Sequence, residues 1–136
     1  MLNLYKSNKV EEITNLLVEE LKICPPSISE NLEDSNIDVS AFIDPVSEQI
    51  NYSKEIGFKF IELHTGKYAE LTGQDQYEEL QRIIESTHLA NDLGLVINAG
   101  HGLNYNNVKK IAAINNINEL NIGHSIVARA LAVGLE

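Results

Sequence analysis

Cysteine is almost absent from this chain of 136 residues, which contains only Cys24. A single cysteine excludes an intrachain disulfide and fits a reducing compartment, so we expect the protein in the cytoplasm. The chain also lacks a long apolar run, and no basic stretch followed by an apolar one occurs at its N-terminus. These absences predict neither a membrane span nor a secretory signal. No Cys/His spacing typical of zinc ligands occurs, so we expect no metal site.

Positive charge is also scarce. Ten Lys and Arg residues face twenty Asp and Glu residues, which gives a net charge of −10. Such a balance argues against nucleic acid and anionic membranes as partners. It does not exclude a phosphate ligand, because a few local N–H groups, Lys or His side chains can bind phosphate in an acidic protein. The apolar content of 43% is sufficient for a real core, and the length allows one domain at most.

Apolar runs alternate with helical periods along most of the chain. A leading helix from about residue 9 to 22 and a polar loop make up residues 1–36, and residues 37–136 form four βα units. Alternation of this kind predicts a parallel sheet. In the first unit, Asp44 and Pro45 are placed as the N-cap and first residue of a helix. The expected strands are 37–43, 58–63, 95–98 and 117–122.

Two turns of similar design follow the third and fourth expected strands. Residues 98–105 read NAGHGLNY, and residues 119–125 read ELNIGHS. Each places a His beside Gly at the carboxyl end of a strand, where α/β folds bind their ligands. Glycine allows a ligand to approach the backbone, and the start of the following helix offers free N–H groups to an anion. These turns are the strongest functional signal in the chain.

Several motifs in the same order resemble the pyridoxine 5′-phosphate synthase family. They are VSAFIDP at 39–45, FIELHTGKYA at 60–69, NAGHGLNY at 98–105, IAAI at 111–114 and ELNIGHSI at 119–126. The resemblance covers residues 37–136 almost without gaps. It implies a TIM (β/α)₈ barrel, of which this chain resembles the second half, strands five to eight.

The resemblance also implies a reaction. The family condenses 1-deoxy-D-xylulose 5-phosphate with 3-amino-2-oxopropyl phosphate to give pyridoxine 5′-phosphate and phosphate, without a metal or an organic cofactor. By motif, His101 matches the proton donor and Glu62 the carboxylate that stabilises the transition state. Gly102, Gly123 and His124 match positions that bind a phosphorylated substrate. Family members assemble into homo-oligomers.

The first half of the family's barrel carries an Asp-His pair, phosphate-binding Arg residues, a catalytic His and a catalytic Glu that have no counterpart here. Residues 1–36 hold neither His nor Arg. Two hypotheses follow. In the first, the chain is an enzyme that is active only when the missing half completes it. In the second, it is a truncated, inactive half barrel that self-associates and at most binds phosphate. The expected partner is a second copy in a homo-oligomer or a complementary half barrel. An isolated half barrel would leave two strand edges and an apolar interior open.

The residues alone leave alternatives for each candidate. His101 and His124 can be turn residues or ligand contacts, and Glu62 in its apolar strand can form a structural ion pair. His64 lies on the same strand face as Glu62 and serves either packing or the site.

Three further residues belong to less specific positions. Lys67 and Tyr68 follow the second expected strand in a loop, where they either contact substrate or face solvent. His88 lies on the long helix expected around residues 77–90 and should be a surface residue.

Overall fold

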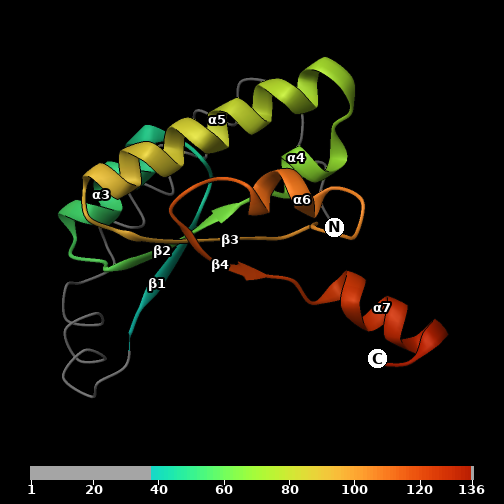
Figure 1. The fold of residues 1–136 in the computed structure, drawn as a ribbon. Helices are drawn as coiled ribbons and strands as arrows, with labels where there is room; N and C mark the ends of the chain where they lie inside the picture. The colour runs from blue at the N-terminus through green and yellow to red at the C-terminus, as the bar shows by residue number, and fades with distance from the viewer. Residues whose placement is uncertain (1–37, 136) are drawn as a thin grey trace, which may run out of the picture. The chain divides into compact units, whose positions relative to one another are not determined.

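The computed structural model describes residues 38–135, and these form a four-stranded parallel β-sheet with helices (Figure 1). The strands lie side by side in chain order, so the predicted parallel, sequential arrangement is confirmed. The leading helix and polar loop predicted for residues 1–36 lie outside the described residues. The strands are β1 (Ser40–Ile43), β2 (Phe60–His64), β3 (Val96–Gly100) and β4 (Ile117–Asn121).

Helices connect the strands and follow the last one, as the alternation predicted. Figure 1 shows α3 to α6 on one side of the sheet, with the long helix α5 running across it. Contacts between α3 and β1 and between α5 and β3 agree with this layering. The described helices are α3 (Ser47–Glu55), α4 (Gly66–Glu70), α5 (Gly73–Asp92), α6 (Val108–Ala112) and α7 (His124–Val133).

The core lies between the sheet and helices α3, α5 and α6. Alternate side chains of a strand point to opposite faces, so every second strand residue enters this core. Ile50 of α3, Ile83 of α5 and Ile111 of α6 meet the strand residues there, and all three are fully buried. The apolar strand residues buried in this core are Ile43, Ile61, Leu63, Ile97 and Ala99.

The opposite side of the sheet, here called the open face, is largely polar. The strand positions of opposite parity carry mainly carboxylate, imidazole and amide groups, so the apolar interior expected for a half barrel is only partly present. The apolar side chains on this face are Phe42, which is 58% exposed, Phe60 and Val96. Toward the carboxyl ends of the strands, the register sets two rows of residues: Phe42, Glu62, Asn98 and Glu119, then His64, Gly100 and Asn121.

A β-bulge interrupts the pairing of β3 with β4. Ile97 pairs with Ile117, but Asn98 pairs with Glu119, so Asn118 is an extra residue in β4. The side chain of Asn118 donates a hydrogen bond to Asn98 Oδ1 at 3.2 Å. The extra residue reverses the alternation of β4 from that point. As a result Leu120 packs against the core, and the next residue along the strand lies on the open face.

The start of α3 differs from the prediction. Asp44 is not the N-cap: the cap position is Val46, which has extended backbone, and the helix begins at Ser47. The N–H of Val46 donates to the carbonyl of Asp44 at 2.8 Å, which forms a turn before the helix. Pro45 lies within this turn instead of the first helical position. The Asp44 carboxylate is therefore not used in capping and contacts His64.

Residues 66–70 form the short helix α4 where a loop was expected. Neither Lys67 nor Tyr68 contacts the pocket described below. Lys67 forms an ion pair with buried Glu79 of α5 at 2.9 Å, and Tyr68 is buried with its hydroxyl donating to the carbonyl of Asn107 at 2.9 Å. His88 is exposed on α5, as predicted.

The Tyr68 hydroxyl should contribute measurably to stability. Replacing Tyr68 with Phe should lower the free energy of unfolding by about 1 kcal/mol, because the carbonyl of Asn107 loses its donor. Burial raises the pKa of Tyr68 above its ordinary value of 10.0. The contribution of the protonated hydroxyl to the unfolding free energy is therefore fully present below pH 10 and is lost as the pH rises through the raised pKa. Urea unfolding at neutral and alkaline pH measures both effects.

Tyr77 of α5 provides the matched control for this prediction, because it is 53% exposed. Tyr77→Phe should leave the unfolding free energy within about 0.5 kcal/mol of the wild type. Equal effects of the two substitutions would contradict the role of the Tyr68 hydrogen bond.

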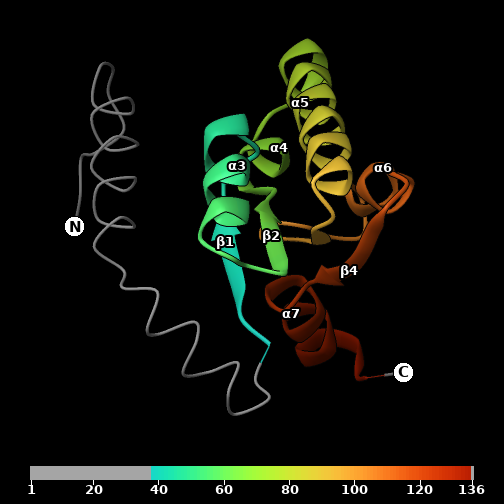
Figure 2. The same ribbon diagram turned by 90° about the vertical axis from the view of Figure 1, so that its left-hand side faces the viewer.

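Helix α7 extends away from the end of β4 (Figures 1 and 2) and has no buried residue. Arg129 stacks over the Tyr105 ring at 5.0 Å, and the rest of the helix is mainly apolar. Among the described residues, no helix combines the length and apolar character needed to cross a membrane. The exposed apolar residues of this segment are Ile126, Val127, Leu131, Val133 and Leu135.

Candidate functional site

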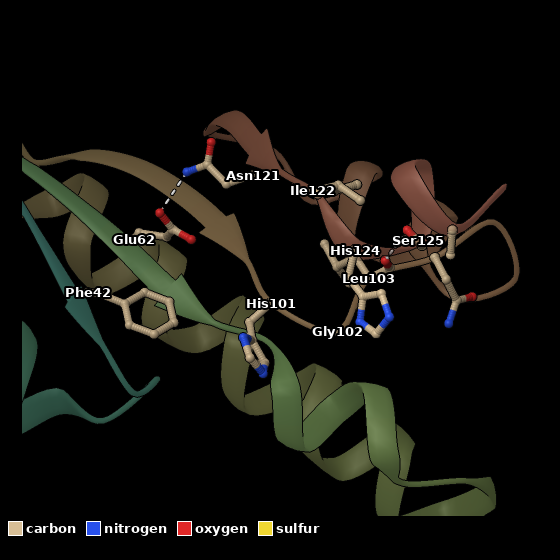
Figure 3. Close-up of a pocket in the computed structure, with 12 residues that line it drawn as sticks. Phe42, Glu62, His101, Gly102, Leu103, Asn121, Ile122, His124 and Ser125 are labelled. Atoms are coloured by element: carbon tan, nitrogen blue, oxygen red, sulfur yellow. Dashed lines mark hydrogen bonds between the residues drawn. The ribbon is translucent and has the colours of Figure 1, made fainter. Parts of the chain in front are cut away.

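A pocket of about 500 Å³ lies at the carboxyl ends of the strands and the start of α7 (Figure 3). Polar groups from β2, β4 and the loops after β3 and β4 face the same hollow. The five residues matched to the family's site, Glu62, His101, Gly102, Gly123 and His124, all line it. The other lining residues are Phe42, Leu103, Asn104, Asn121, Ile122, Ser125 and Ala128.

Glu62 reaches across the sheet from β2 toward β4. Its Oε2 atom accepts a hydrogen bond of 2.7 Å from the side-chain amide of Asn121, drawn as a dashed line in Figure 3. Gly100 of β3 lies between them: a Cβ atom there would collide with the Glu62 carboxylate and lie 2.8 Å from the backbone oxygen of Asn121. Among the described residues Glu62 forms no ion pair, so the partner of this carboxylate is a neutral amide.

His101 is exposed at the end of β3 and has a backbone φ of +79°. Residues other than glycine rarely adopt this left-handed backbone conformation, and those that do are concentrated at functional sites. The hydroxyl of buried Thr65 lies 2.7 Å from the carbonyl oxygens of both Gly100 and His101. This contact holds the strained backbone and fixes where the imidazole leaves the sheet.

Gly102 continues the turn with a φ of +73°. A Cβ atom at this position would lie 2.7 Å from the Cβ of Ala69 in α4. Both the conformation and the space therefore require glycine here. The turn brings the backbone of the loop to the wall of the pocket, where a ligand can approach it.

Gly123 and His124 start α7 on the other side of the pocket. Gly123 is the N-cap, and His124 is the first helical residue. The Ser125 hydroxyl donates to the carbonyl of Leu103 at 2.8 Å, which ties the start of α7 to the loop after β3. The first N–H groups of a helix have no partner within it, so this end of α7 is suited to an anion.

Two side chains that position groups at or beside the pocket were not predicted from the sequence. Asn121 holds Glu62, and Asp44 contacts His64 beside His101. The contact between Asn121 and Glu62 left one trace in the sequence. A glycine inside a strand, here Gly100, indicates that groups of neighbouring strands approach each other closely.

Two kinds of group do not occur at this pocket. Within residues 38–135, no cluster of three His, Cys, Asp or Glu side chains could hold a metal ion. The described arginines, Arg82 and Arg129, do not line the pocket, so its polar side chains are carboxylate, imidazole, amide and hydroxyl groups.

Comparison with known proteins identifies the family. The profile of the family "Pyridoxal phosphate biosynthesis protein PdxJ" matches residues 17–136. The pyridoxine 5′-phosphate synthase of Prochlorococcus marinus strain MIT 9312 is 87% identical over 107 residues, which are 79% of this chain and 45% of the relative. The enzyme of the same name from Synechococcus sp. strain WH7803 is 47% identical over 129 residues, 93% of this chain and 52% of the relative.

The chain spans about half the length of these curated relatives. The matched residues include both Gly-His turns and all residues of the pocket. This chain therefore belongs to the PdxJ family of pyridoxal phosphate biosynthesis proteins.

Proposed function

We propose that this chain supplies the second half of the active site of a pyridoxine 5′-phosphate synthase. The reaction condenses 1-deoxy-D-xylulose 5-phosphate with 3-amino-2-oxopropyl phosphate to pyridoxine 5′-phosphate and phosphate. The observation that carries this proposal is the meeting of Glu62, His101 and His124 in one pocket with the glycines beside them. The relatives at 87% identity bear the name of this enzyme.

Each group has a role that its chemistry suits. Ring closure by condensation needs dehydrations and enolisations, and these need proton transfer near neutral pH, which an imidazole performs well. We assign the proton donor to His101. Condensation of an amine with a ketone passes through cationic imines, and the fixed carboxylate of Glu62 stabilises such charge. Gly102, Gly123 and His124 bind the phosphate of the aminoketone substrate.

We also propose that the described sheet is half of a (β/α)₈ barrel, strands five to eight. Within the described residues, the outer edges of β1 and β4 have no paired strand, and α7 packs none of its apolar side chains in a core. In a barrel, α7 would lie over β4 and a following strand. A complementary half barrel or a second copy would supply that strand, and the complementary half would also supply the Arg groups missing from the pocket.

The experiment that tests this function compares the chain alone with a fused full-length protein. In the fusion, the part of the Prochlorococcus marinus MIT 9312 relative that precedes the position aligned with Asp38 is joined to residues 38–136 of this chain. Formation of pyridoxine 5′-phosphate from the two substrates is measured for both. We expect turnover from the fusion close to that of the relative, and none from the chain alone.

Two results would contradict the proposal. Robust turnover by the chain alone would show that no complementary half is needed. A fusion that folds but forms no product would support the alternative of an inactive half barrel that at most binds phosphate.

The isolated chain should associate in solution. Among the described residues, the outer edges of β1 and β4 pair with no strand, and these edges and the exposed side chains of Ile126, Val127 and Leu131 favour contact with another copy. Sedimentation at micromolar concentration should show dimers or larger species. Leu131→Glu, at a position 86% exposed, should shift the distribution toward monomer without loss of secondary structure. A compact monomer with cooperative unfolding for the unsubstituted chain would contradict this prediction.

A further inference from the structure

We propose that Asp44 and His64 form a hydrogen-bonded pair that positions His101 for its proton transfer. This inference rests on the proposed function for its chemical meaning. The pair combines one residue that was expected to cap a helix with one whose role the sequence left open. His64 does not line the pocket, whereas His101 does, so His64 acts on the site through its neighbour.

The first link joins Asp44 to His64. The carboxylate oxygen Oδ1 of Asp44 lies 3.2 Å from Nδ1 of His64. Asp44 follows β1 and His64 ends β2, so the contact bridges two neighbouring strand ends. A carboxylate accepts hydrogen bonds but donates none when ionised, so Nδ1 must carry the proton. In the neutral ring this leaves Nε2 without a proton, and the carboxylate thereby selects the tautomer.

The second link joins the two imidazoles. The ring centroids of His64 and His101 are 4.7 Å apart with an interplanar angle of 53°. The His64 ring also packs edge-to-face with the Phe42 ring, with 5.1 Å between the two ring centroids. The ring of His64 is therefore held by three groups, and its place limits where the ring of His101 can lie.

The backbone around His64 is built for this approach. A Cβ atom on Gly66 would lie 2.7 Å from His64 Nε2 and 2.8 Å from His101 Cδ2, so only glycine leaves room for the two rings. Thr65, which lies between His64 and Gly66 in the sequence, donates a hydrogen bond from its hydroxyl to the carbonyl of His101. His64 and Thr65 thus contact the ring and the backbone of His101, and Gly66 leaves the space that the two rings need. This convergence distinguishes the pair from a surface contact, although Asp44 itself is 59% exposed.

The tautomer of His64 gives a direct test in the full chain. Long-range ¹H–¹⁵N spectra of histidine-labelled protein report which ring nitrogen carries the proton. We expect the Nδ1–H form for His64 in the wild type and a shift of population to the Nε2–H form in Asp44→Ala. The ring signals of His101 should move in the same variant, whereas those of His88 and His124 stay in place. Asp92→Ala, which removes an exposed acid from the end of α5, is the matched control.

A wild-type His64 in the Nε2–H form would overturn the proposal, as would His101 signals that Asp44→Ala leaves unmoved. The spectra need no activity, so they test the pair even if the proposed function fails. In the active fusion, His64→Gln should lower kcat about 10-fold with KM little changed, because only the placement of His101 is affected. His88→Gln, on the exposed side of α5, should change neither constant. An unchanged kcat for His64→Gln in a folded, active fusion would also overturn the proposal.

Discussion

Replacing His101 with Asn in the full-length fusion should lower kcat by about 10²- to 10⁴-fold, the usual contribution of a positioned proton donor. Asn is the suitable replacement because it tolerates the left-handed backbone that His101 adopts at φ +79° better than most residues. The side chain is exposed, so the unfolding free energy should change little. Steady-state kinetics with both substrates, together with urea unfolding, separate the loss of chemistry from a loss of fold.

His88→Asn is the control for this substitution, because His88 is exposed on α5 and remote from the pocket lining. It should leave kcat and KM unchanged. A fall of less than tenfold in kcat for His101→Asn would contradict the assignment of the proton donor. Equal losses in both variants would indicate a general effect on folding.

Replacing Gly100 with Ala should disturb both the sheet and the site. The added Cβ would collide with the Glu62 carboxylate and lie 2.8 Å from the backbone oxygen of Asn121, which cannot move without disturbing β4. Overpacking of this kind costs about 1–3 kcal/mol in stability. In the fusion, Glu62 would also be displaced from its hydrogen bond with Asn121, so kcat should fall even at temperatures where the variant is fully folded.

Gly123→Ala provides the matched control for stability. No atom lies within 4 Å of a Cβ at Gly123, and its φ of −117° suits any residue. Its unfolding free energy should fall by only a few tenths of a kcal/mol, from the loss of glycine at the cap of α7. If Gly100→Ala were as stable as Gly123→Ala and Glu62 kept its contact with Asn121, then Gly100 would not be required for the position of Glu62.

The sequence by itself determined the order and type of the main elements. Runs such as residues 58–63 and 95–98 are mainly apolar and each follows a glycine, and the period of Leu80, Ile83 and Ala90 is that of a helix. These are local patterns, so they predict strands, the long helix and the parallel sheet without knowledge of the fold. Because parallel strands end at the same edge, the two Gly-His turns could also be placed together in advance.

The tertiary structure decided which residues hold the candidate site. The extra residue Asn118 in β4 is one of several polar residues there, and only pairing with β3 shows that it reverses the alternation and brings Asn121 to Glu62. Asp44 reads as a helix cap from its neighbours in sequence, but its carboxylate contacts His64, twenty residues away.

The burial of Tyr68 was likewise decided by the tertiary structure and not by the local sequence. Tyr68 reads as a loop residue beside the site, but it is buried and bonds to the loop before α6, which no local pattern indicates. Local propensity depends on residues within a few positions of one another, and it predicted the elements correctly. The contacts that position Glu62 and His101 join segments 20 to 59 residues apart, so only the register of the sheet and the packing of the strand ends determine them.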